Sequence, residues 1–173
     1  MKAFVEHVNR SSVTKAPHPL PENDRMTVFL AGSIDMGSAE NWQERAESLM
    51  RSSGFNILNP RRDDWDSSWK QTIKNDKFVE QVEWELTGMD RSDAILVYFD
   101  PKGKAPITLL EIGLHASSGK LFICCPDGFW KKGNVEVVCK RYSIPLFEAL
   151  EPCVKAVIEF KEKNFSNSSD KTN

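Results

Sequence analysis

Carboxylate side chains are the groups in this sequence whose positions best suit catalysis, and Glu111 is the foremost of them. It follows an apolar run at residues 94–99, which is typical of a buried parallel strand, and a loop-like segment at residues 100–105. A helix is predicted to begin near Pro106, because proline suits the first helical turn and Thr108 is an acceptable capping residue. Glu111 would then lie in or near that turn, at the sheet edge where α/β proteins bind ligands.

The expected position of Glu111 suggests a chemical role. A carboxylate near a helix N-terminus is held ionised by the helix dipole and by unpaired backbone N–H groups. An ionised carboxylate in a fixed position is what a nucleophile at a sugar carbon requires. A plainer interpretation remains, in which Glu111 is only a glutamate near a helix start. Other carboxylates are available to bind hydroxyl groups or to move protons: Asp35, Asp63, Asp64, Glu85 and Asp100.

Other catalytic chemistries find little support. The histidines are scattered, and no Ser nucleophile elbow is present. Of the four cysteines, Cys124 and Cys125 are adjacent inside an apolar run, which favours buried thiols over disulfides or a metal knuckle. The turn at residues 32–38 could hold a phosphate at the following helix N-terminus, but it matches neither common nucleotide-binding motif. We therefore predict no metal and no cofactor.

The composition indicates one domain with a hydrophobic core, because the 173 residues are 40% hydrophobic. A formal net charge of −2 offers no electrostatic basis for binding a nucleic acid polymer or an anionic membrane. No apolar run approaches the ~20 residues of a membrane span, and residues 1–10 lack the apolar core of a signal peptide. We expect a reduced, soluble, cytoplasmic protein.

Apolar runs alternate with amphipathic segments along the chain, which predicts alternating strands and helices. Strands are expected at residues 26–31, 55–59, 94–99, 120–125 and 144–147. Helices are expected at residues 39–52, 75–90, 107–117, 134–140 and 148–163. The pattern predicts an α/β three-layer sandwich with a five-stranded parallel sheet in the flavodoxin/Rossmann-like order 2-1-3-4-5. The expected organisation is an extended or disordered arm (1–24), one domain (25–164) and a disordered tail (165–173).

Three loops are expected at the carboxyl edge of this sheet, near the point where the strand order reverses: residues 32–38, 60–69 and 100–111. The loop at 60–69 contains two arginines, three aspartates and two tryptophans. A charge run is usually a solvated surface, but tryptophans beside converging charges are also typical of pocket walls. The convergence of unusual segments on one edge predicts a ligand site there.

Several segments together resemble the nucleoside 2-deoxyribosyltransferase superfamily. They comprise residues 28–34, 93–97 and 110–113, and the similarity is closest to its deoxyribosyltransferase-like branch through residues 59–66 and 107–111. The resemblance implies that Glu111 is a nucleophile that attacks C1′ and forms a glycosyl-enzyme ester. It also implies that Glu85 handles the base and its proton, and that Asp100 supports the sugar or base.

The resemblance further implies a homodimer or a higher homo-oligomer and a small nucleoside or nucleotide as the bound partner. The sequence departs from the family in some places. Residues 141–144 offer no asparagine for the sugar, Phe29 stands near an expected tyrosine, and residues 105–108 replace a glycine-rich approach. Our substrate-binding candidates are Gly32, Ser33, Asp35, Arg61, Asp63, Asp64, Trp65 and Thr108.

The predicted activity is cleavage of the N-glycosidic bond of a (deoxy)nucleoside, with transfer of the sugar to another base. Arg61 and Arg62 open an alternative, because guanidinium groups match phosphate geometry and would suit an N-hydrolase of (deoxy)nucleoside 5′-monophosphates. The competing interpretation is that both arginines pair with aspartates of their own loop. A further alternative is a nucleotide-binding or sensing module that has lost turnover.

Overall fold

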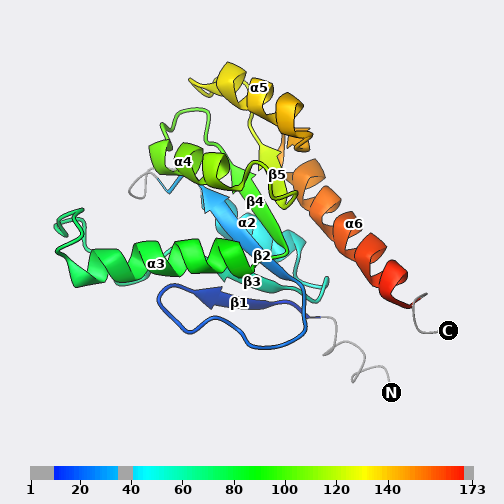
Figure 1. Cartoon of the computed structure of the whole chain (residues 1–173), viewed down its shortest axis with the longest axis horizontal. Coiled ribbons are helices and arrows are strands. Elements are labelled where there is room, and N and C mark those ends of the chain that lie inside the picture. Colours follow the sequence, from blue (N-terminus) through cyan, green and yellow to red (C-terminus); the bar gives the residue numbers. More distant parts are fainter. Residues whose placement is uncertain (1–9, 35–40, 170–173) are drawn as a thin grey trace.

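A six-stranded parallel sheet forms the centre of the structure, a computed structural model that describes residues 10–34 and 41–169 (Figure 1). The strands follow the spatial order β1-β3-β2-β4-β5-β6, and every neighbouring pair is parallel. Their bounds are β1 (Ser12–Lys15), β2 (Thr27–Gly32), β3 (Asn56–Asn59), β4 (Ala94–Tyr98), β5 (Leu121–Cys124) and β6 (Leu146–Phe147). The predicted α/β class and the relative order of the five predicted strands are confirmed.

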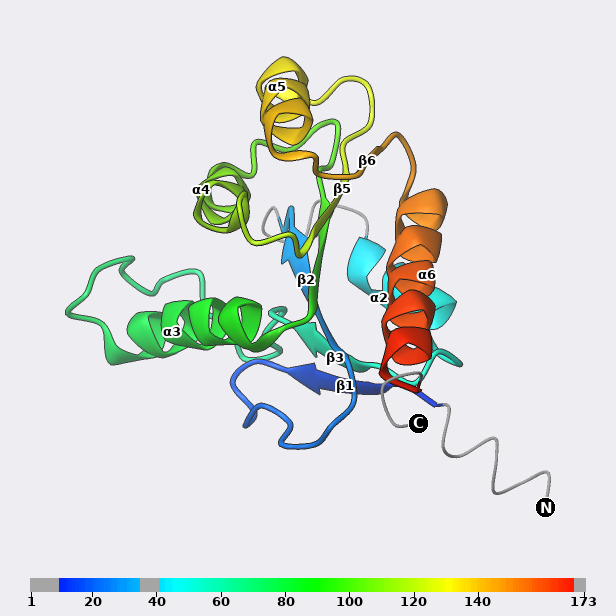
Figure 2. The same cartoon turned by 45° about the vertical axis from the view of Figure 1, so that its right-hand side comes forward.

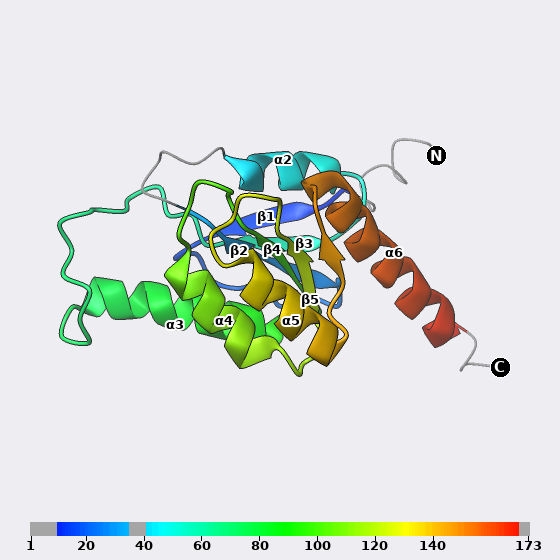
Figure 3. The same cartoon turned by 90° about the horizontal axis from the view of Figure 1, so that it is seen from above.

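Helices cover both faces of the sheet, which gives the three layers of the predicted sandwich (Figures 2 and 3). One face carries α2 (Trp42–Leu49) and α6 (Leu150–Ser169). The other face carries α3 (Asp76–Arg91), α4 (Pro106–His115) and α5 (Lys132–Tyr142). No helix in the described ranges is long and apolar enough to cross a membrane.

The alternation of side chains along the central strands divides the core in two. In β2, Phe29 and Ala31 face the cluster under α3, α4 and α5, while Val28 and Leu30 face the cluster under α2 and α6. All four side chains are almost fully buried. Apolar residues without polar gaps are the expected composition of a parallel strand that is covered on both faces.

The end of β2 is fastened to the end of β4. Gly32 lies so close to β4 that a Cβ atom there would overlap the carbonyl oxygen of Tyr98, which explains the need for glycine. The next residue, Ser33, donates its backbone N–H to Tyr98 O at 3.0 Å and accepts from the Asp100 N–H through Oγ at 3.1 Å. The indole Nε1 of Trp42 donates to Ser33 O at 3.0 Å. These bonds fix two of the three loops at the carboxyl edge.

The expectation of five strands is wrong by one, because part of the predicted arm forms β1 and pairs with β3. This strand has only four residues, two exposed and two half-buried, so no hydrophobic alternation marks it in the sequence. The segment that follows is held to α3 by a hydrogen bond of 2.7 Å from Trp84 Nε1 to His18 O. At the other end of the chain, α6 continues to Ser169, past the predicted domain end at residue 164.

The two glycines inside helices α3 and α4 should respond in opposite ways to replacement by alanine. At Gly88 a Cβ atom would lie 2.9 Å from the buried ring of Phe29, whereas at Gly113 it would meet nothing within 4 Å. We expect Gly88→Ala to lower the free energy of unfolding by about 1 kcal/mol or more through overpacking. We expect Gly113→Ala to raise it by about 0.5–1 kcal/mol through helix propensity. Urea denaturation of both variants tests this, and equal effects would contradict the close approach of α3 to β2.

Candidate active site

Two glutamates from different helices form the chemical centre of the site. Glu85 lies in α3 and Glu111 in α4, two helices that cover the same face of the sheet on either side of β4 in sequence. Burial raises the pKa of Glu111 to about 8, and the charge of Glu85 contributes to this rise. Burial also raises the pKa of Glu85, to about 7. Both carboxyl groups therefore lie in water-poor surroundings, and the charge of Glu85 acts on Glu111.

The expectation that Glu111 is held ionised by the helix start is wrong. Glu111 is the sixth residue of α4, so it lies beyond the first turn, where the dipole and the free N–H groups act. The helix is preceded by Ala105 in the left-handed conformation (φ 43°) and has no side-chain cap, so Thr108 does not cap it. Desolvation dominates instead and favours the protonated form of Glu111.

Glu85 is held in place by a neighbour on its own helix. Gln81 Nε2 donates to Glu85 Oε1 at 2.7 Å, and this hydrogen bond lowers the pKa of Glu85 against the larger effect of burial. The same nitrogen donates to the backbone carbonyl of Pro60 at 2.8 Å, and Gln81 is 5% exposed. Because Glu85 and Glu111 interact, they titrate as a pair that can hold one proton near neutral pH. Such a pair can supply an acid and a nucleophile together.

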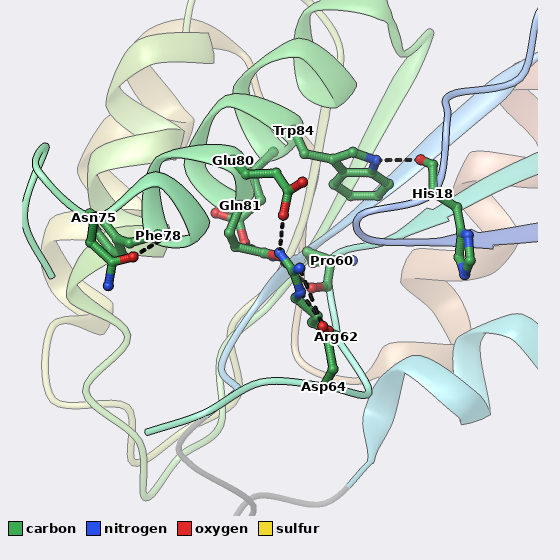
Figure 4. A network of polar contacts seen from close by, with 10 residues as sticks. His18, Pro60, Arg62, Asp64, Asn75, Phe78, Glu80, Gln81 and Trp84 are labelled. Atoms are coloured by element: carbon green, nitrogen blue, oxygen red, sulfur yellow. Dashed lines mark hydrogen bonds and ion pairs between the residues drawn. The ribbon is translucent and has the colours of Figure 1, made fainter. Parts of the chain in front are cut away.

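Arg62 organises the loop that enters α3 (Figure 4). Its guanidinium contacts Asp64 at 2.6 Å and Glu80 at 2.8 Å, with only 4% of the side chain exposed. It also lies over the ring of Trp69, 5.1 Å from the centroid. The guanidinium holds the pKa of Asp64 below its usual range. For Arg62, the interpretation of pairing within the loop is confirmed.

The remaining residues of this loop have separate partners. Arg61 reaches the start of α2, where its Nη1 donates to Asn41 Oδ1 at 3.2 Å. Asp63 forms an ion pair of 2.8 Å with Lys15 of β1. Trp65 is 41% exposed and packs edge-on against Trp69, with ring centroids 5.2 Å apart. The side-chain partner of Arg61 is thus an asparagine of another segment and not an aspartate of its own loop. The ring of Trp65 remains partly exposed to solvent.

The other candidate residues lie around the same sheet edge. Gly32 and Ser33 form the turn after β2, and Ser33 is buried with its hydroxyl occupied by the Asp100 N–H. The carboxylate of Asp100 accepts from the Lys102 N–H at 2.8 Å and so shapes its own turn. Thr108 is buried in the first turn of α4. Asp35 lies outside the described residues.

Two residues of α3 and α4 were not anticipated. Gln81 was not singled out from the sequence, because glutamine is common on helices. The one feature of the sequence that could have indicated its contact is the four-residue spacing to Glu85. His115 of α4 is buried, and burial lowers its pKa. All four cysteines are buried and free, as predicted, and burial raises the pKa of each thiol. Within residues 10–34 and 41–169, no group of three or more His, Cys, Asp or Glu side chains could hold a metal ion.

A comparison with protein families gives one match. A family model described as "Nucleoside 2-deoxyribosyltransferase like" matches residues 25–129, which is more than half of the chain. The matched segment runs from just before β2 to the loop after β5, and it contains both glutamates. No curated protein matches the chain.

The buried pair should make the protein less stable as the pH rises. The folded protein keeps protons on Glu85 and Glu111 up to about pH 7 and 8, whereas the unfolded chain releases them near the ordinary value of 4.5. This contribution to stability is complete below pH 4.5 and is lost as the pH rises through those values. We expect Glu111→Gln to match the wild type at pH 4.5 and to exceed its free energy of unfolding at pH 9 by on the order of 3 kcal/mol.

Denaturant unfolding across this pH range measures the difference. Glu83→Gln is the matched control, because Glu83 is an exposed glutamate of the same α3 helix. The control should follow the wild-type curve at every pH. A constant difference between Glu111→Gln and the wild type would show that Glu111 is not desolvated.

Proposed function

The chain belongs to the nucleoside 2-deoxyribosyltransferase-like family, and from this premise we propose that it cleaves the N-glycosidic bond of a (deoxy)nucleoside and transfers the sugar to another base. The observation that carries the proposal is the pairing of Glu85 and Glu111 in one desolvated environment. Displacement at a sugar carbon by way of a covalent intermediate requires two such carboxyl groups, one as the nucleophile and one as the proton donor.

The proposed reaction has two steps. Glu111, in its ionised form, attacks C1′ while the bond from C1′ to the base nitrogen breaks, and Glu85 donates its proton to the departing base. The product is an ester between the Glu111 carboxylate and the sugar. In the second step a nitrogen of the incoming base attacks C1′, the ester bond breaks, and the proton of that nitrogen returns to Glu85. The enzyme ends in the state in which it began.

The roles require one proton on Glu85 and one negative charge on Glu111, and a pair that titrates around pH 7 to 8 holds a single proton near neutrality. Because burial raises the pKa of Glu111 above that of Glu85, the free enzyme carries this proton mainly on Glu111, and the proton has to move to Glu85 before Glu111 can attack. A proton donor with a pKa near the working pH both carries the proton and releases it readily. A desolvated carboxylate is also a stronger nucleophile than a hydrated one, because no water shell has to be removed.

The contacts of Arg62 favour a nucleoside over a nucleotide. Hydrolysis of a (deoxy)nucleoside 5′-monophosphate would require a cationic group for the phosphate, and Arg62 is engaged with Asp64 and Glu80 instead. Arg61 remains as the loop arginine with a neutral partner, Asn41. A hydrolase reaction would use the same ester on Glu111, with water in place of the second base.

We further propose that the protein forms a homodimer or a larger homo-oligomer through α4. Three apolar side chains form one stripe along this helix at i, i+3 and i+7, and each is about 60% exposed: Ile107, Leu110 and Leu114. An apolar stripe of this kind on an exposed helix is typical of an association surface. The stripe lies on the helix that holds Glu111, so association would also position the nucleophile.

The covalent intermediate provides the direct test. Intact-protein mass spectrometry after incubation with a panel of deoxynucleosides and their 5′-monophosphates should show an adduct of deoxyribose that maps to Glu111, with free base released in parallel. Glu111→Gln should form no adduct and lose activity by at least about 10³-fold, because the nucleophile is gone. Glu85→Gln should slow turnover by about 10²–10⁴-fold through loss of the proton donor.

Glu83→Gln again serves as the control and should keep full activity. An adduct of deoxyribose phosphate would favour the nucleotide substrate, and release of base without an acceptor would favour hydrolysis. Full activity of Glu111→Gln would refute the proposed nucleophile. Ligand-induced stabilisation without any adduct or free base would indicate a binding module instead.

The oligomer can be tested separately by light scattering on the purified protein. We expect Leu110→Glu, which places a charge at the middle of the α4 stripe, to reduce the measured mass to that of one chain. Ile73→Glu is the matched control, because Ile73 is an apolar residue that is 84% exposed in the loop before α3. A wild-type protein with the mass of one chain, or equal masses for both variants, would contradict this interface.

A further inference from the structure

We propose that Gln81 is a positioning residue that fixes the orientation of Glu85 and selects which of its oxygens delivers the proton, an inference that rests on the proposed function. The contacts form a short chain from the end of β3 to the candidate acid. The backbone carbonyl of Pro60 accepts from Gln81 Nε2 at 2.8 Å, and Glu85 Oε1 accepts from the same nitrogen at 2.7 Å. Figure 4 shows Gln81 lying between α3 and the Pro60 segment.

The Pro60 carbonyl determines the orientation of the Gln81 amide. A carbonyl oxygen can only accept, so the Gln81 NH₂ group must face Pro60, and the reversed amide would place two acceptors against each other. With this orientation, both amide hydrogens of Gln81 are used, one on Pro60 and one on Glu85. Gln81 Oε1 is buried and accepts no hydrogen bond from a described residue. Among the described residues, the Gln81 amide is therefore held only by the two hydrogen bonds that its NH₂ group donates.

The orientation of Gln81 in turn assigns the two oxygens of Glu85. When Glu85 is protonated, its carbonyl oxygen is the better acceptor, and the N–H of Gln81 makes Oε1 that oxygen. The proton then resides on Oε2. During the reaction this proton leaves Oε2 for the base nitrogen, the electron pair of the O–H bond stays on the carboxylate, and the negative charge is stabilised at Oε1 by the Gln81 N–H.

Gln81 also adjusts how firmly the proton is held. Burial favours the protonated form of Glu85, and the hydrogen bond from Gln81 opposes that effect. Without the hydrogen bond, the carboxyl group would rotate about its terminal torsion and release its proton less readily. The charged group facing this pair from the neighbouring helix is Glu111 of α4, and Gln81 faces it from α3.

The test compares Gln81→Met, which keeps the length of the side chain but removes both donors, with a matched control. Trp84→Phe removes one donor of the same helix, the indole N–H that bonds His18 O at 2.7 Å. We expect Gln81→Met to reduce kcat/KM for ordinary deoxynucleosides by about 10–100-fold, because the proton donor is misplaced. Trp84→Phe should lower thermal stability to a similar degree and leave kcat/KM unchanged.

A second substrate separates positioning from general damage. A deoxyriboside of an N-alkylated, cationic base departs without protonation, so the loss in Gln81→Met should shrink to within about threefold for this substrate. An equal loss for both substrates would overturn the proposal, because it would show that Gln81 supports the fold of the site and not the proton donor.

A titration without substrate keeps the inference separate from the proposed function. In protein labelled with ¹³C at the glutamate carboxyl carbons, the Glu85 signal can be assigned by its absence in Glu85→Gln. We expect its titration midpoint to rise by about one pH unit in Gln81→Met and to stay fixed in Trp84→Phe. An unchanged midpoint in Gln81→Met would overturn the role of Gln81 whatever the turnover. A wild-type protein without any N-glycosidic activity would refute the proposed function. The titration midpoint of Glu85 would still show whether the hydrogen bond from Gln81 affects its proton.

Discussion

The partial burial of two interacting carboxyl groups is the constraint on which the candidate site depends. Removing Glu85 and Glu111 from water makes their charged forms costly, and the charge of Glu85 adds to the cost of ionising Glu111. The rest of the structure must hold α3 and α4 together against this cost. It does so through a shared apolar core, which continues from Phe29 on β2 to Ile112 on α4. The folded state thus accepts a cost in stability at the two groups to which we assign the chemistry.

The helices are positioned by close backbone contacts at two places. Gly88 brings α3 against Phe29 in the centre of the sheet, and Gly32 brings the end of β2 against β4. In addition, the Gln81 side chain connects α3 to the carbonyl of Pro60, the residue after β3. The segments that meet at the carboxyl edge are therefore fixed by bonds between backbone groups and the side chains of Ser33, Trp42 and Gln81. Arg62 adds the ion pairs that order the remainder of that loop.

The sequence predicted the features that the hydrophobic pattern determines, namely the fold class and the strand order. It did not predict the features that depend on residues far apart in the chain. The five apolar runs gave the α/β class and the relative order of their strands, because burial on both faces leaves a clear signal. The strand β1 left no such signal, since its pairing with β3 uses backbone groups that every residue has. The position of Glu111 near a helix start was predicted correctly to within a turn, yet its protonation was not. That property depends on desolvation and on Glu85, which is 26 residues away in the chain.

The position of β1 has a consequence for the outline of the domain. The family match begins at residue 25, so β1 lies outside it, although it supplies a full row of backbone hydrogen bonds to β3. Without β1, the buried strand β3 would present its open N–H and C=O groups at the margin of the sheet, which is a template for pairing with other chains. The covering strand β1 has four residues, two exposed and two half-buried, and it ends at Lys15. In this chain, therefore, a segment outside the family match covers the edge of the matched part of the sheet.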